Sequence, residues 1–153
     1  MEKRDRVSLE WRDFAELSPG LLYELLQFRQ AIFVVEQASP YADLDGLDAR
    51  ARHLLLRVDG ALIGYLRLVK LDGRVRIGRV AVAAPSRGRG LARRLIDEAL
   101  ASQRRDDPRA VVALSAQTYL VPFYQSLGFV AESAPYDDYG VPHVDMGRAG
   151  SAL

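Results

Sequence analysis

The segment from Arg74 to Ser115 constrains the fold most, because its pattern is that of strand, glycine-rich loop, helix and strand. Apolar residues alternate over 74–83, and Arg87-Gly88-Arg89-Gly90 follows. Apolar residues at helical spacing then predict a helix from Leu91 to about Arg104, and the apolar run 111–115 predicts a buried strand. A helix that connects two neighbouring strands makes them parallel, so we expect a mixed sheet that is locally parallel here.

Two Asp-Gly dipeptides predict hairpin turns before that segment. Asp59-Gly60 separates apolar runs over 53–58 and 61–71, and Asp72-Gly73 ends the second run. The remaining elements are expected as follows: a first strand over 7–12, a helix from Pro19 to about residue 34 that is capped by Ser18, a loop over 36–50, a short helix over 121–127 and strands over 129–133 and 141–146. The predicted order is therefore β-α-β-β-β-α-β-α-β-β.

Composition excludes several classes of protein. A chain of 153 residues fits one domain, which we expect to span 1–153. The absence of cysteine excludes a disulfide framework, a cysteine nucleophile and a cysteine-rich zinc site, and we expect no metal. A net charge of +1 argues against nucleic-acid or anionic-membrane partners. No apolar run approaches membrane-spanning or signal-peptide character, so the expected location is cytoplasmic.

The Arg/Gly loop has the chemistry of a phosphate site. Backbone N–H groups at a helix N-terminus bind anions, and glycine allows a diphosphate to approach the main chain. A Walker loop would need Lys-Ser/Thr after Gly90, where Leu91 stands, and a Rossmann fingerprint would need glycine at Arg93. The alternative is a tight strand-to-helix connection with solvent-facing arginines. The loop by itself supports both interpretations equally.

Longer motifs decide between a phosphate site and a simple strand-to-helix connection. Val80-Ala81-Val82 followed by Arg87-x-x-Gly90-x-Ala92 resembles motif A of the GNAT acetyltransferases, and Phe123-Tyr124-x-x-x-Gly128-Phe129 resembles motif B. The chain is also similar to the ElaA-like subfamily, on segments that include 26–37, Ile77-Gly78-Arg79-Val80, Ala116-Gln117 and Pro142-His143. The resemblance spans about residues 7–148. It implies the GNAT acyl-CoA N-acyltransferase fold, of the α/β (α+β) class, with a mixed, mostly antiparallel central sheet of six to seven strands flanked by about four helices.

The resemblance also implies an activity and a site. The expected reaction is transfer of the acetyl group of acetyl-CoA to a small-molecule or peptide amine, with a coenzyme-A-binding sensor or adaptor as the alternative. Without cysteine, direct transfer through a ternary complex is favoured over an acetyl-enzyme. The residues implied in coenzyme binding are Val80, Ala81, Val82, Arg87, Gly88, Arg89, Gly90, Leu91, Ala92 and Gln117, with the N–H of Val82 as oxyanion donor.

Four side chains are candidates for proton transfer. Tyr124 is the expected general acid, because a phenol stays protonated at neutral pH and can meet the leaving thiolate, although a core tyrosine has the same pattern. Glu36, His143 and His53 are the candidate bases, and Glu36 is the preferred one. A structural role is the stronger interpretation of His53 and an equal alternative for His143.

The acidic segment around the expected acceptor entrance suggests a cationic amine. Glu36, Asp43, Asp45 and Asp48 concentrate negative charge there, which favours a polyamine, a lysine side chain or an N-terminus. A solvated loop offset by Arg50 and Arg52 is an equal alternative. A homodimer is compatible with the sequence, which does not determine the oligomeric state.

Overall fold

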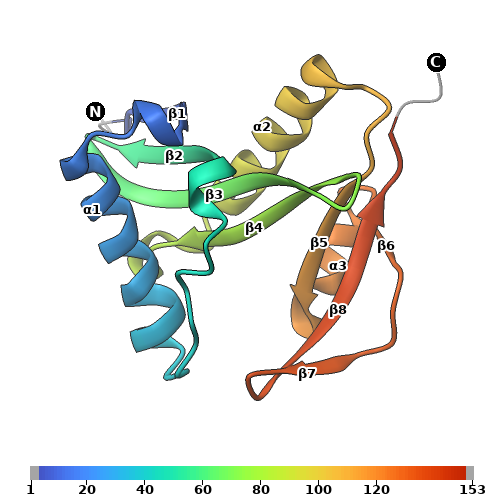
Figure 1. Ribbon diagram of the computed structural model, residues 1–153. Coiled ribbons are helices and arrows are strands. Elements are labelled where there is room, and N and C mark those ends of the chain that lie inside the picture. Colours follow the sequence, from blue (N-terminus) through green and yellow to red (C-terminus); the bar gives the residue numbers. More distant parts are fainter. Residues whose placement is uncertain (1–3, 151–153) are drawn as a thin grey trace.

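The computed structural model describes residues 4–150 of the chain. Over that range eight strands form one sheet in the order β1-β2-β3-β4-β5-β8-β6, with β7 paired to β8 (Figure 1). The strands are β1 Val7–Asp13, β2 Arg52–Val58, β3 Ala61–Leu71, β4 Arg74–Val82, β5 Val112–Gln117, β6 Val130–Ala131, β7 Tyr136–Asp138 and β8 Val141–Arg148. The α-helices are α1 Pro19–Arg29, α2 Leu91–Asp106 and α3 Val121–Gln125.

The strand pairing confirms the predicted mixed, mostly antiparallel sheet. β1 to β4 form an antiparallel meander, whereas β4 and β5, which α2 connects, run parallel. Both Asp-Gly turns are hairpins with positive φ at each central residue, 51° and 85° at Asp59 and Gly60 and 53° and 75° at Asp72 and Gly73. These angles belong to turns whose twist matches the flanking strands, which is why the dipeptide predicts them.

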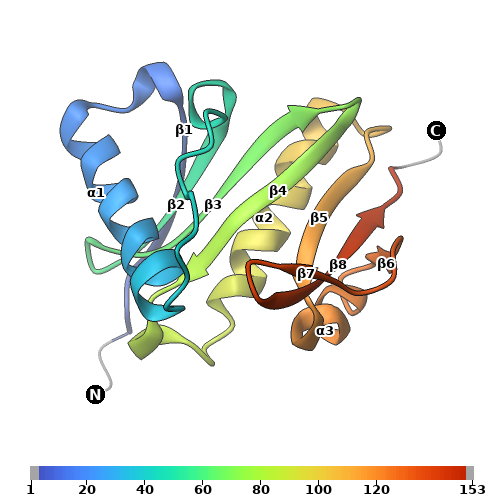
Figure 2. The ribbon, with the colours of Figure 1, turned by 60° about the horizontal axis from the view of Figure 1, so that its bottom comes forward.

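The two long helices cover opposite faces of the sheet (Figures 1 and 2). Leu95 and Ile96 of α2 are fully buried in a core that includes Leu54, Leu56 and other residues of the central strands. On the other face, a smaller core contains Leu25 of α1 together with Leu55 and Tyr65. Alternate residues of β2 therefore enter different cores, as the pleat of a strand requires.

The N-terminal helix differs from the prediction in its last turns. Ser18 caps it as expected, because its hydroxyl accepts a hydrogen bond from the N–H of Leu21 at 3.1 Å. The α-helix ends at Arg29, however, and Gln30–Glu36 continues as a π-helix. The π-helix has only 7 residues, fewer than two turns, so the apolar pattern did not separate it from an α-helix. π-Helical segments are rare and occur frequently at functional sites.

Two further differences concern the C-terminal third. The strand expected over 129–133 is reduced to Val130–Ala131, and Tyr136–Asp138 forms a strand that the sequence pattern did not predict. Both strands are short and are formed by pairing with β8, so their own residues show no periodic apolar pattern. Within residues 4–150, no helix has the length and apolar character needed to span a bilayer.

Candidate active site

The candidate site is the gap between β4 and β5. The two strands pair only at Val75 with Val112 and at Arg76 with Ala113, and they then separate (Figure 2). A cleft of about 340 Å³ opens between them. Its walls come from β4, β5, the π-helix and the loop that follows it, and the β7–β8 hairpin, and they include Phe33, Tyr41, Val80, Gln117, Tyr124 and His143.

A β-bulge lies on β4 where the strands separate. The register of β3 against β4 shifts between Tyr65 and Arg67, so that Arg79 and Val80 together oppose one residue of β3. Arg79 has a φ of 54°, in the left-handed region that residues with a Cβ rarely adopt. The bulge turns the Arg79 side chain toward the loop after the π-helix, where it contacts Tyr41 and Asp43.

The bulge is followed by a main-chain donor that faces the gap. The N–H of Ala83 bonds to the carbonyl of Ile63 on β3 at 2.8 Å. Successive residues of an antiparallel strand direct their main-chain groups alternately to the two sides, so the N–H and C=O of Val82 point toward β5. β5 is no longer paired with β4 at that level, so it offers the Val82 N–H no partner. The main-chain groups of Ala81, by the same alternation, belong to β3 through Tyr65.

The Arg/Gly loop of residues 87–90 follows β4, which ends at Val82. Gly88 and Gly90 have φ values of 79° and 77°, and within residues 4–150 no atom outside the adjacent residues lies within 4 Å of the position that a Cβ would occupy at either. Gly90 is the N-cap of the 16-residue helix α2, and no side chain caps that end. The N–H groups of Leu91 and Ala92 therefore face open space at the positive end of the helix dipole. The residues present fit a diphosphate.

Arg87 connects this loop to two neighbours. Its Nε donates to the carbonyl of Val82 at 2.9 Å, and its Nη2 lies 2.7 Å from Oε2 of Glu36, the last residue of the π-helix. Glu36 is thus ion-paired at the loop and is not among the residues that line the cleft. Arg89 is more exposed and lies 3.5 Å from Asp5.

Tyr124 lines the cleft from α3 although only 6% of it is exposed. Its ring contacts Phe123 and Phe129 edge-on, with centroids 5.1 and 5.9 Å away. Burial, with a smaller contribution from Tyr119, raises the pKa of Tyr124 to about 12. Within residues 4–150 its hydroxyl has no hydrogen-bond partner, so it stays protonated and available to a ligand.

His143 and Gln117 lie on facing positions of β8 and β5 and both line the cleft. Nδ1 of His143 is 2.8 Å from the carbonyl oxygen of Val141. A carbonyl only accepts, so Nδ1 carries the proton in that bond and Nε2 of the neutral ring has a lone pair. The imidazole stacks on Tyr136 of β7, with ring centroids 6.3 Å apart.

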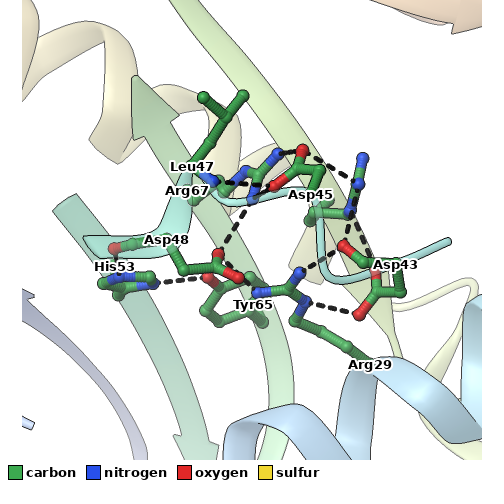
Figure 3. Close-up of polar contacts among 9 residues, drawn as sticks. Arg29, Asp43, Asp45, Leu47, Asp48, His53, Tyr65 and Arg67 are labelled. Carbon is green, nitrogen blue, oxygen red and sulfur yellow. Dashed lines mark hydrogen bonds and ion pairs between the residues drawn. The ribbon is translucent and has the colours of Figure 1, made fainter. Parts of the chain in front are cut away.

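His53 lies outside the cleft wall, next to Asp48 of the acidic loop, the segment 37–50 that carries Asp43, Asp45 and Asp48 (Figure 3). It is fully buried, its Nε2 donates to the carbonyl of Asp48 at 3.0 Å, and its Nδ1 accepts from the hydroxyl of Tyr65 at 2.5 Å. Both nitrogens are therefore used inside the fold. The geometry gives His53 a structural role, as the stronger interpretation of the sequence expected.

The acidic loop is neutralised by three arginines (Figure 3). Asp43, Asp45 and Asp48 form ion pairs with Arg29 of α1, Arg67 of β3 and Arg79 of β4, at distances that include 2.7 Å from Arg29 to Asp48 and 2.8 Å from Arg79 to Asp43. Arg50 and Arg52, which the sequence offered as counterions, are not in this network. The charge on which a cationic acceptor was expected is thus balanced within the fold. Nothing local in the sequence identifies these partners.

The matched family model is an acetyltransferase (GNAT) domain, over residues 24–149. The protein ElaA of Escherichia coli is 40% identical over 147 residues, which cover 92% of this chain and 96% of that protein. The crystal structure of Escherichia coli ElaA superposes with a TM-score of 0.89 at 38% identity, over 94% of this chain and 99% of the other.

Two other solved structures extend the comparison. An acyl-CoA N-acyltransferase from Pseudomonas aeruginosa has a TM-score of 0.89 at 39% identity, over 94% of this chain and all of the other. A GNAT family acetyltransferase from Elizabethkingia anophelis with acetyl-CoA bound has a TM-score of 0.69 at 14% identity, over 95% and 99% of the two chains. The last of these supports the fold alone.

The buried His53 predicts a pH dependence of stability. Burial lowers its pKa from the ordinary 6.5, so the folded chain binds this proton less readily than the unfolded chain. The contribution of neutral His53 is complete above pH 6.5 and is lost as the pH falls toward the folded pKa. Urea unfolding from pH 7.5 to 5 should therefore show a falling free energy that His53→Gln flattens. His143→Gln, the other histidine of the chain, is the control; an unchanged slope in His53→Gln would contradict the assignment.

Proposed function

This chain belongs to the GNAT acetyltransferases, a family of acyltransferases, and from that premise we propose that it transfers the acetyl group of acetyl-CoA directly to an amine, within a ternary complex. The observation that carries the proposal is the early end of the β4–β5 pairing, which leaves the Val82 N–H without a partner on β5, next to a glycine-rich helix N-terminus. The absence of cysteine supports direct transfer over a covalent acetyl-enzyme. We place the reaction in the cytoplasm.

Acetyl-CoA supplies an acetyl group activated as a thioester. We propose that Gly88, Gly90 and the first N–H groups of α2 hold its diphosphate, with Arg87 and Arg89 adding charge. Val80 and Gln117 line the cleft in which we place the pantetheine arm, Val82 follows on the same strand edge, and Ala81 supports that edge through its pairing with β3. The Val82 N–H donates to the thioester carbonyl oxygen and stabilises the negative charge that develops there.

The proton balance requires one acceptor and one donor. An ammonium acceptor first loses a proton, which we assign to Nε2 of His143. The amine nitrogen then bonds to the acetyl carbon, the carbon–sulfur bond breaks with its electron pair on sulfur, and the second proton that the nitrogen loses on becoming an amide is released to solvent. The Tyr124 hydroxyl donates a hydrogen bond to that thiolate. Because the pKa of Tyr124 is about 12, above the ~8.5 of an ordinary thiol, this hydroxyl stabilises the leaving group and does not hand over its proton completely.

The geometry favours His143 over Glu36 as the base. Nε2 of His143 carries a lone pair and the ring lines the cleft, whereas the Glu36 carboxylate is engaged with Arg87 outside the lining. We propose that Glu36 positions the phosphate loop by holding Arg87. This assignment reverses the order of preference that the sequence suggested.

Gly90→Val tests the coenzyme site. Acetyl-CoA at about 100 times its dissociation constant should stabilise the wild type by roughly 2.7 kcal/mol, a midpoint rise of about 5–11 °C. The valine fills the space that the diphosphate needs, so most of that rise should disappear. Gly60→Val is the matched control, because Gly60 has a similar φ of 85° in open space but lies in a hairpin turn. A full rise in Gly90→Val, measured from its own midpoint without ligand, excludes this loop as the phosphate site.

Tyr124→Phe tests the leaving-group contact. The ring and its packing remain, so the midpoint rise with acetyl-CoA should be unchanged, while kcat falls by about 100-fold, the low end of acid–base contributions. kcat and kcat/KM should fall together where chemistry limits both. Tyr119→Phe is the control, since Tyr119 lies nearby and is 73% exposed. Wild-type turnover of Tyr124→Phe, in a free-thiol assay with chemistry rate-limiting, would assign this tyrosine to the core alone.

His143→Gln and Glu36→Gln separate the base from the positioning residue. His143→Gln should lower kcat by about 100-fold or more with little effect on the KM of acetyl-CoA. Glu36→Gln should raise that KM and leave kcat nearly constant, because it frees Arg87 without touching the amine. A large loss of kcat in Glu36→Gln, with nearly constant kcat in His143→Gln, would identify Glu36 as the base.

A further inference from the structure

The open face of the sheet carries a polar row beyond the thioester end of the cleft. On β4, Val75 and Ile77 belong to the core under α2, so Arg76 between them points to the opposite face. Ser115 on β5 lies between two core residues in the same way, as does Asp145 on β8. Arg76 and Ser115 both line the cleft.

Arg76 is a cation without a partner of its own. Over residues 4–150 its guanidinium makes no hydrogen bond and no ion pair, although it is only partly exposed. The other two arginines in the cleft wall, Arg67 and Arg79, are held by the aspartates of the acidic loop. An unpaired guanidinium in a concave wall is a ready binding group for a carboxylate.

The neighbouring Asp145 is not that partner. Its Oδ1 accepts hydrogen bonds from the hydroxyls of Tyr136 at 2.6 Å and of Ser115 at 2.8 Å. The Tyr136 hydrogen bond is the largest cause that lowers the pKa of Asp145, and the charge of Arg76 contributes less. Asp145 thus has its own partners, and Arg76 acts on it only across a longer distance.

Arg76 is also too far from the phosphate loop to bind the coenzyme diphosphate. It stands six residues before Val82 on an extended strand, about 20 Å away at 3.3 Å per residue. The coenzyme reaches the thioester position from the Val82 end. Arg76 therefore lies on the acceptor side of the reacting atoms.

The opposite end of the cleft suits an amine. His143 presents Nε2 there, and Asp138 on β7, beside it in the hairpin, also lines the cleft and has no ion pair among the described residues. His143 is the partner of Gln117, whereas Arg76 is the partner of Ala113, four residues earlier on β5. The main chains of Arg76 and His143 are therefore offset by about 13 Å along the strands, and the arginine side chain shortens the distance between the functional groups.

We propose that the acceptor is an amine that also carries a carboxylate, several bonds away from the nitrogen, and that Arg76 binds this carboxylate while His143 and Asp138 receive the amine. The chemistry fits an ω-amino acid or a short peptide with a free C-terminus. This inference deepens the proposed acetyl transfer and depends on it for the role of the amine. Among the cationic amines that the acidic loop suggested, it disfavours a polyamine, which carries no carboxylate.

A ladder of paired acceptors tests the proposal. The probes are the ω-amino acids from glycine to 6-aminohexanoate, each compared with its primary amide, in a free-thiol assay with acetyl-CoA. In the wild type, kcat/KM for the longer carboxylates should exceed that of the matched amides by about 10- to 100-fold, the range for one hydrogen-bonded charge. Arg76→Gln should bring this ratio close to one, and Arg76→Lys should restore part of it. Arg74→Gln is the control, because Arg74 is exposed, ion-paired with Glu132 and outside the cleft wall.

The outcomes separate this inference from the acetyl transfer itself. Equal acetylation of carboxylates and amides, or a preference that survives Arg76→Gln, overturns the inference and leaves the transferase intact. If no probe is acetylated, calorimetric titration of 6-aminohexanoate and its amide into the coenzyme A complex decides. Binding of the carboxylate that Arg76→Gln abolishes would support the inference although the transfer had failed, and equal or absent binding of the two would overturn it.

Discussion

The pairing between β4 and β5 ends after Arg76, and the candidate site follows from that interruption. Parallel strands that remained paired would satisfy the Val82 N–H within the sheet and close the cleft. Main-chain groups left without a partner carry a cost of about 1–3 kcal/mol each when they are removed from water. The separated strand edge is therefore a surface that a ligand with its own amide groups can complete, and a pantetheine arm is such a ligand.

The bulge that accompanies the separation is stabilised from outside the strand. A residue with a Cβ in the left-handed region costs on the order of 1–2 kcal/mol. Arg79 recovers this through hydrogen bonds to the carboxylate and carbonyl of Asp43, at 2.8 and 3.0 Å, and through its contact with the ring of Tyr41. Asp43 is also held by the fully buried Arg29 of α1. The helix, the acidic loop and the bulge are thus one unit, and removing one member of such a buried charge pair typically costs 3–5 kcal/mol.

Local chemistry predicted the hairpin turns and the conformation of the Arg/Gly loop well. The Asp-Gly turns and the glycine-rich loop depend on φ values that few residues adopt, so the sequence marks them directly. The acceptor side was harder, since its features depend on residues far apart in the chain. Arg29, Arg67 and Arg79 meet the acidic loop only in the folded chain, and the ion pair of Glu36 with Arg87 joins positions that no periodicity connects. The bulge was also hidden, because an arginine gives no sign of a positive φ.

We propose that acetyl-CoA binds along the unpaired edge of β4 and is held by the first turn of α2. Hydrogen–deuterium exchange of the full chain, with and without saturating acetyl-CoA, tests this binding mode. Exchange should slow at Val82 and over 88–92, with little change in β1 and β2, which lie on the far side of the sheet. Unchanged exchange at Val82 and in the loop, with protection elsewhere under saturating ligand, would contradict it.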